Sequence, residues 1–153
     1  PSHPSPSMYL SIFITICLVV GAITFHYWVL GLLLGVVPNP ETDHSHFLRS
    51  LSLLLMIVFS HVLEIVVFAL GYLAGVRYLG WSMPGFGGDQ ILSFFDAFYH
   101  SATTYSTLGL SKVPSGEAGF MTAMESLTGI IILTWSATFF YNILGRTPSK
   151  DDE

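Results

Sequence analysis

Three long apolar runs, separated by short polar segments, dominate the pattern of the chain. They cover residues 8–37, 47–80 and 120–145, and the first carries no Asp, Glu, Lys or Arg. An α-helix rises about 1.5 Å per residue, and about 20 apolar residues are enough to cross the hydrocarbon core of a bilayer. Each run is therefore predicted to form a transmembrane helix, which makes the fold an all-α membrane protein.

The segment between the second and third runs has a different pattern. Residues 91–104 carry apolar side chains at helical spacing, but about 14 residues make a helix of about 20 Å, which is too short to cross. The polar sequence STLGLS follows. Irregular backbone at membrane depth is tolerated only where it is buried in protein or lines a watery path. The pattern predicts a short helix and a loop that re-enter the membrane from one side.

The two ends of the chain are polar. Residues 1–7, PSHPSPS, are predicted to be a disordered lead-in, and residues 146–153, RTPSKDDE, a polar tail. If the re-entrant segment enters from outside, the N-terminus lies outside and the C-terminus lies in the cytoplasm. The count of Lys and Arg then favours the cytoplasmic side by three to two, as the positive-inside rule expects. The three are Arg49, Arg146 and Lys150, and the two are Arg77 and Lys112.

Composition supports a membrane protein and excludes some functions. The chain is 52% hydrophobic and 10% charged, whereas about a quarter of the residues of a soluble domain are charged. We expect the lipid bilayer to be a main partner. Lys and Arg number five in all, which argues against the clustered basic face that binds nucleic acid. No predicted span carries the repeated arginines of a voltage sensor.

Three stretches around the re-entrant segment carry a resemblance to a known family. They are HVLEI in the second run, FYHSATTYSTLG around the short helix, and AMESLTGIIILTWSATF in the third run. Together they resemble the pore module of potassium channels, and most of all the small bacterial channel-type proteins whose filter reads TTLGYGD. The likeness covers about residues 47–144, and the run at residues 8–37 is similar to the leading helix of those proteins.

The resemblance implies a fold, an assembly and an activity. Residues 47–145 would form a potassium-channel-like pore module, with an outer helix, a re-entrant pore helix, a filter-like loop and an inner helix. Four copies would surround one pore as a homotetramer in a bacterial inner membrane. The permeant ion would be a monovalent cation, K⁺, and the protein would be neither an enzyme nor dependent on a cofactor.

The filter-like sequence keeps the first half of the family's pattern and departs from the second half. Leu110 and Ser111 stand where the family has an aromatic residue and a second glycine, and Lys112 stands at the outer mouth in place of Asp. A serine at positive φ costs about 1–2 kcal/mol, and four lysines would repel cations. The resemblance therefore implies weakened potassium selectivity, low conductance or no conductance. The implied selectivity filter is Thr107, Leu108, Gly109, Leu110 and Ser111.

Ionisable residues within the predicted spans are candidates for function, because a charge in the bilayer is costly. His61 and Glu64 are three residues apart and share a helix face, and Glu125 lies in the outer half of the third run. The resemblance places them behind the pore loop, as buried polar support or as a proton or gating sensor. Gly129 is a candidate gating hinge, although close helix packing explains a membrane glycine equally well.

Two other functions fit the same residues. A channel-like subunit that does not conduct could belong to a larger membrane complex, and the altered filter favours this alternative. A metal-binding or redox subunit could use the histidines and carboxylates of the predicted membrane segments. No H-x-x-x-H or E-x-x-H spacing supports that set, so no metal site is predicted. Its members are His26, His61, Glu64, His100 and Glu125.

Overall fold

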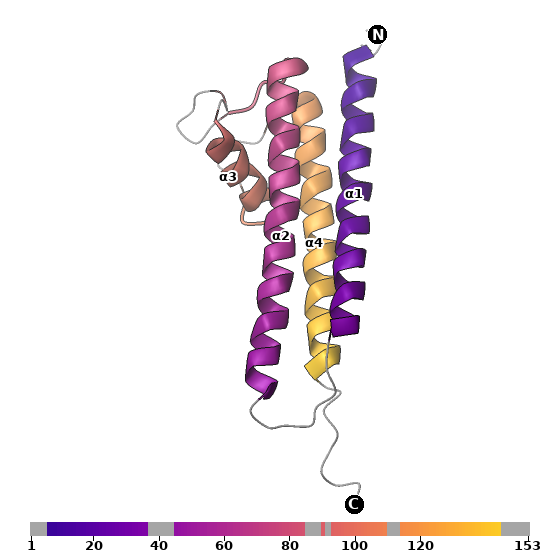
Figure 1. The fold of residues 1–153 in the computed structure, drawn as a ribbon. Coiled ribbons are helices and arrows are strands. Elements are labelled where there is room, and N and C mark those ends of the chain that lie inside the picture. Colours follow the sequence, from indigo (N-terminus) through magenta and orange to yellow (C-terminus); the bar gives the residue numbers. More distant parts are fainter. Residues whose placement is uncertain (1–5, 37–44, 85–89, 91–92, 110–113, 145–153) are drawn as a thin grey trace, which may run out of the picture.

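Four helices build the part of the chain that the structure describes. The computed structural model describes residues 6–36, 45–84, 90, 93–109 and 114–144. The long helices are α1 (Pro6–Val36), α2 (Ser45–Tyr78) and α4 (Gly116–Leu144), and the short helix is α3 (Phe94–Tyr105). Each long helix has the length and apolar composition to cross a membrane, so the prediction of three apolar spans is confirmed (Figure 1). Residues 1–5 of the predicted lead-in and the predicted tail lie outside the described residues. The last two residues of the predicted lead-in, Pro6 and Ser7, are not disordered but belong to α1.

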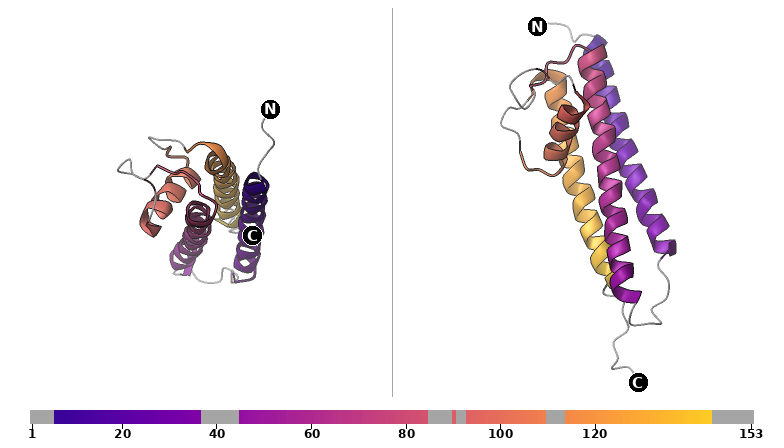
Figure 2. Two further views of the ribbon diagram at one scale, coloured as in Figure 1. Left: turned by 90° about the horizontal axis from the view of Figure 1, so that it is seen from above. Right: turned by 60° about the vertical axis from the view of Figure 1, so that its left-hand side comes forward.

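The three long helices form a bundle, and α3 packs on one side of it (Figures 1 and 2). α1 packs against α2 and α4, and α3 packs against the same two helices from the opposite side. In the described part of the chain, α1 and α3 do not pack against each other. The pair α2 and α4 therefore forms the centre of the molecule, and any coupling between α1 and α3 passes through that pair.

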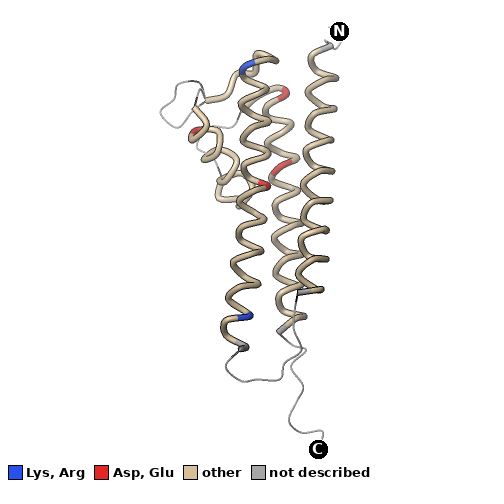
Figure 3. The backbone as a smooth tube through the Cα atoms, in the orientation of Figure 1, with Lys and Arg blue, Asp and Glu red and all other residues tan. Residues whose placement is uncertain are grey.

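In the described part of the chain, charged residues lie mostly near the ends of helices, including Asp96 in the first turn of α3 (Figure 3). Arg49 and Arg77 lie near opposite ends of α2, and Glu117 lies in the first turn of α4. Glu64 and Glu125 are the exceptions, because each lies well inside its helix and is buried. A charge at membrane depth is costly unless polar partners surround it. These two glutamates are therefore candidates for a functional role.

The start of α4 differs from the predicted start of the third run. The helix begins at Gly116, four residues before residue 120. The additional turn contains Glu117, whose charge kept this turn out of the apolar run. A carboxylate in the first turn stabilises a helix, because the helix dipole is positive at that end. The third helix predicted from hydropathy alone was therefore too short at its N-terminal end.

Small residues on α2 allow its neighbours to approach closely. A Cβ on Gly75 would collide with the ring of Trp81, and a Cβ on Gly71 would lie 2.6 Å from the Met121 side chain of α4. The Trp81 indole N–H donates a hydrogen bond to Ser11 Oγ of α1 at 3.1 Å. In lipid, helices associate through such close contacts and through hydrogen bonds between helices. These contacts hold α1, α2 and α4 together at the end of the bundle where α3 begins.

The N-terminal end of α3 is closed by its own side chains. Ser93 Oγ accepts a hydrogen bond from the Asp96 N–H at 3.1 Å and donates one to the Asp96 carboxylate at 2.6 Å. Ser93 is a typical N-cap residue, because its side chain satisfies a backbone donor that the first helical turn leaves unpaired. This cap explains why α3 begins at Phe94.

Candidate functional site

The chain leaves α3 through a turn of the Schellman type. The Leu108 N–H donates to the Thr103 carbonyl at 3.0 Å, and the Thr107 N–H donates to the Thr104 carbonyl at 3.1 Å, which is the hydrogen-bond pattern of that motif. Thr107 has a φ of 60° at the position that is usually glycine, which costs about 1–2 kcal/mol. Gly109 has a φ of 86°, which glycine adopts without that cost.

Three backbone carbonyl oxygens, those of Thr107, Leu108 and Gly109, follow the turn. No hydrogen bond from a described residue reaches the carbonyl oxygen of Thr107, Leu108 or Gly109. The Leu108 side chain is 80% exposed, so this segment lies on the outside of the single chain. Backbone oxygens at membrane depth need partners. These three oxygens are therefore available to an ion, to water or to another copy of the chain.

An open hollow of about 260 Å³ lies between this segment and α4. Thr104 is buried, and its Oγ1 has no hydrogen-bond partner in the part of the chain that the structure describes. A buried hydroxyl without a partner is unusual and calls for an explanation. Most of the lining residues carry hydroxyl groups, which suits contact with water or cations. They are Thr103, Thr104, Thr107, Thr122 and Ser126.

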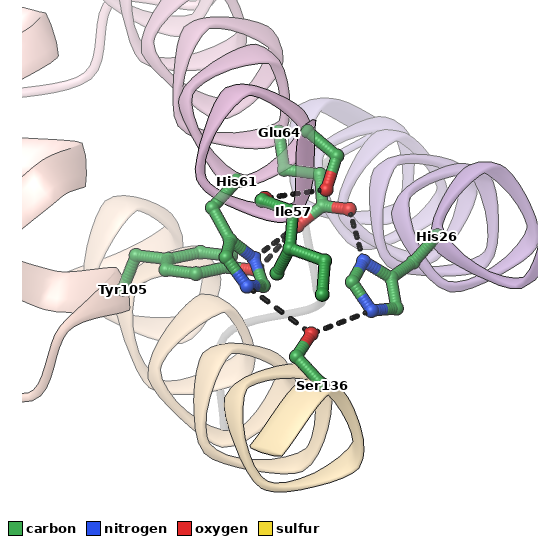
Figure 4. Close-up of polar contacts among 7 residues, drawn as sticks. His26, Ile57, His61, Glu64, Tyr105 and Ser136 are labelled. Atoms are coloured by element: carbon green, nitrogen blue, oxygen red, sulfur yellow. Dashed lines mark hydrogen bonds and ion pairs between the residues drawn. The ribbon is translucent and has the colours of Figure 1, made fainter. Parts of the chain in front are cut away.

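A first buried network joins all four helices around Glu64 (Figure 4). His26 Nδ1 lies 2.9 Å from Glu64 Oε1, and His61 Nδ1 lies 3.3 Å from Glu64 Oε2. The Tyr105 hydroxyl of α3 donates to Glu64 Oε2 and lies 3.0 Å from His61 Nδ1. Ser136 Oγ of α4 lies 2.9 Å from His26 Nε2 and 3.2 Å from His61 Nε2. The two imidazoles are thus held between one carboxylate and one hydroxyl.

A second buried network joins α2, α3 and α4 around Glu125. The Tyr72 hydroxyl donates to Glu125 Oε2 at 2.5 Å, and Ser101 Oγ donates to Glu125 Oε1 at 2.5 Å. Ser101 Oγ also lies 2.9 Å from the carbonyl oxygen of Ile65. One carboxylate therefore connects α4 to a side chain of each of the other two helices. Among the described residues, the hydrogen-bond partners of the Glu125 carboxylate are therefore hydroxyls and not basic groups.

One comparison with known families identifies the class of protein. A family model described as Ion channel matches residues 51–146, which is more than half of the chain and spans α2, α3 and α4. The chain belongs to the ion channel family. No curated protein and no solved structure matches it. In this channel α1 lies outside the matched residues, and His26 is the residue of α1 that enters the network around Glu64.

The five histidines and carboxylates that the sequence raised as one set divide into two groups in the channel. One donor atom from each of His26, His61 and Glu64 lies within 4.8 Å of the others, so these three could hold a metal ion. His100 and Glu125 belong to the second network, where His100 Nε2 lies 3.2 Å from the Thr122 hydroxyl. The five-residue set raised from the sequence is therefore not one site.

The predicted polar support residues lie beside α3 in the channel, and their functional role stays a prediction. Glu64 contacts α3 through the Tyr105 hydroxyl, and Glu125 contacts it through Ser101. No pattern in the sequence pointed to Tyr105, Ser101 or Ser136 as members of these networks. A tyrosine or serine is a weak indicator of a buried polar network, because on a membrane helix it can face lipid, a neighbouring helix or the bilayer surface.

Gly129 lies where α4 crosses the end of α3. A Cβ at this position would collide with the carbonyl oxygen of Tyr105. A glycine is therefore needed here for close packing, and the role of Gly129 as a gating hinge stays a prediction.

The predicted filter falls only partly within the described residues. Thr107, Leu108 and Gly109 follow α3 as set out above. Leu110, Ser111 and the outer-mouth residue Lys112 lie outside the described residues.

Proposed function

We propose that this protein is a tetrameric, potassium-channel-like cation channel in which α3 is a re-entrant pore helix. The observation that carries the proposal is the row of carbonyl oxygens at Thr107, Leu108 and Gly109, which no described residue contacts by a hydrogen bond. They directly follow a short helix packed between two long apolar helices, and they lie within the residues that match the ion channel family.

Physical chemistry favours a cation at these oxygens. An ion that enters a narrow pore must exchange its water for other oxygen ligands, and rings of backbone carbonyls provide them without a fixed charge. The C-terminal end of α3 adds a partial negative charge beside the hydroxyl-lined hollow. One chain offers one set of oxygens, so a ring requires several copies around a common axis. Four copies complete the ring in this proposal.

The second half of the filter sets the expected selectivity. Leu110 and Ser111 replace the aromatic residue and the glycine that the resemblance leads us to expect, and Lys112 adds a positive charge at the outer mouth. The proposed channel therefore conducts K⁺ as its permeant ion with weakened selectivity and low conductance. It lies in a bacterial inner membrane, with the N-terminus outside and the C-terminus in the cytoplasm.

The test is an ion-flux measurement on purified protein in liposomes, with K⁺ and Na⁺ compared. We expect K⁺ flux that falls at least several-fold in Gly109→Ala, because an alanine is strained at a φ of 86°. Gly31→Ala is the matched control, because a Cβ on Gly31 meets nothing within 4 Å. The combined change Leu110→Tyr, Ser111→Gly and Lys112→Asp is expected to raise conductance and the preference for K⁺ over Na⁺.

Particle symmetry tests the assembly independently of flux. Fourfold particles in electron microscopy support the pore. A single copy among unlike subunits would overturn it, as would fourfold particles that pass no ion in any variant. Either result would instead support a channel-like subunit that does not conduct.

A further inference from the structure

Three side chains of kinds that commonly bind metal ions meet in the first network. One of them comes from α1, which lies outside the residues that match the ion channel family. His26 comes from α1, and His61 and Glu64 come from α2. Both Nδ1 atoms face the same carboxylate, at 2.9 Å and 3.3 Å from its two oxygens. Atoms bound to one tetrahedral zinc ion at 2.0–2.2 Å lie roughly 3.3 Å from one another. The two distances to the carboxylate are close to this value, and all three donor atoms lie within 4.8 Å of one another.

The protons of the network are too few for its hydrogen bonds. His26 and His61 each have one contact to Glu64 and one to Ser136. Tyr105 adds a fifth contact, to Glu64, and a sixth, to His61 Nδ1. Each contact needs one proton. With Glu64 ionised and both imidazoles neutral, only four are present, one each from His26, His61, Ser136 and Tyr105. At least one pair of acceptors therefore faces each other unless an additional cation binds.

A metal ion at the Nδ1 atoms removes this conflict. Both imidazoles then direct their Nδ1 lone pairs at the metal and carry their protons on Nε2. Ser136 Oγ lies within hydrogen-bond distance of both Nε2 atoms, and its two lone pairs can accept both N–H groups. The Tyr105 hydroxyl donates to Glu64 Oε2. Hydrogen-bond partners that hold the metal's ligands in this way fix the tautomer and orientation of metal-binding histidines.

We propose that His26, His61 and Glu64 bind one divalent transition-metal ion of the Zn²⁺ class, and that this ion fastens α1 to the channel module. Two imidazoles and one carboxylate are a ligand set that suits Zn²⁺ and its neighbours in the first transition row. The site is enclosed, with side-chain exposures of 0% for His26 and 1% for Glu64, and His61 at 12% offers the way in. The proposal does not depend on ion conduction.

The test uses the purified full-length chain in detergent and Zn²⁺ as the probe. The protein is stripped with a chelator, incubated with Zn²⁺, separated from free metal by gel filtration and analysed for zinc per chain. We expect about one zinc ion per wild-type chain. His26→Gln and Glu64→Gln should each weaken binding at least roughly tenfold, because each removes a ligand. His100→Gln is the matched control, because His100 is buried in the other network. This variant should bind as much zinc as the wild type.

Substitution of Co²⁺ for Zn²⁺ provides a second measurement on the wild type alone, so it does not depend on whether a variant folds. Visible ligand-field bands of tetrahedral Co²⁺ with nitrogen and oxygen ligands would support the site. A wild-type chain that retains neither metal overturns the proposal and leaves an additional proton as the cation of the network. Zinc content that depends on His44, which lies outside the described residues, and on His46 in the first turn of α2, and not on His26, also overturns it.

Discussion

The two buried glutamates of this channel are stabilised by different chemistry. Glu64 is surrounded by two imidazoles and the Tyr105 hydroxyl, whereas Glu125 is held by the Tyr72 and Ser101 hydroxyls. The hydroxyl protons around Glu125 meet both of its oxygens. The groups around Glu64 cannot satisfy one another without one additional cation, as the proton count shows.

The two networks also differ in what they join. The network around Glu125 connects α2, α3 and α4, all within the residues that match the ion channel family. The network around Glu64 reaches beyond them to His26 of α1. The comparison teaches that a carboxylate satisfied by neutral donors can act as fixed support, whereas one paired with imidazoles can respond to a cation.

Removal of the carboxylate from the first network should have the largest effect. Glu64→Ala leaves His26 and His61 buried without their shared acceptor, and breaking a buried ionic pair costs about 3–5 kcal/mol. The free energy of unfolding of the detergent-solubilised, metal-free protein measures this loss. A cost below about 1 kcal/mol would show that the imidazoles do not depend on Glu64.

Zinc should stabilise the folded protein by a similar but smaller amount. At a free Zn²⁺ concentration about 100 times the Kd, binding to the folded state alone adds about 2.7 kcal/mol. We expect this gain in the wild type and in Glu125→Ala. In Glu64→Ala we expect a gain of about 1.4 kcal/mol or less, because binding there is at least tenfold weaker. Thermal unfolding with and without Zn²⁺ makes the comparison, and an equal gain in all three proteins contradicts binding at Glu64.

Removal of the second carboxylate should cost less than removal of the first. Glu125→Ala leaves two hydroxyl donors, but each has another acceptor within reach. Tyr72 lies 3.3 Å from the Thr122 hydroxyl, and Ser101 lies 2.9 Å from the Ile65 carbonyl. We expect a loss of about 1–3 kcal/mol in the same unfolding measurement. A loss larger than that of Glu64→Ala would reverse the comparison.

The smallest expected effect comes from deleting one tyrosine hydroxyl in each network. Tyr105→Phe and Tyr72→Phe form a matched pair, and each removes one donor to a buried carboxylate. Each should cost about 1 kcal/mol, the net contribution of a typical hydrogen bond within a protein. If the proposed metal binds at Glu64, Zn²⁺ should still stabilise both variants, since neither change removes a ligand. Loss of the zinc effect in Tyr105→Phe would make that hydroxyl a ligand.

The order of the helices could be predicted from the sequence, and the ends were predicted less well. Long apolar runs specify membrane helices because hydropathy is summed over adjacent residues. The start of α4 was missed because Glu117 interrupts the apolar run without interrupting the helix. The short helix α3 was predicted from apolar spacing, and its end at Tyr105 lies one residue beyond the predicted end at Thr104.

The candidate site could be predicted only where its residues are neighbours in the sequence. His61 and Glu64 were paired because they lie three residues apart on one helix. His26 and Ser136 are separated by 110 positions, and no local pattern could bring them together.

By itself, then, the sequence determined that this is a membrane protein of three apolar helices with a short polar segment between the second and third. Those features depend on composition and local spacing. Only the tertiary structure decided that His100 stands apart from His26, and that each buried glutamate contacts its own set of partners. The reason is that contacts between helices depend on how whole helices pack, and helix packing is a property of the folded chain.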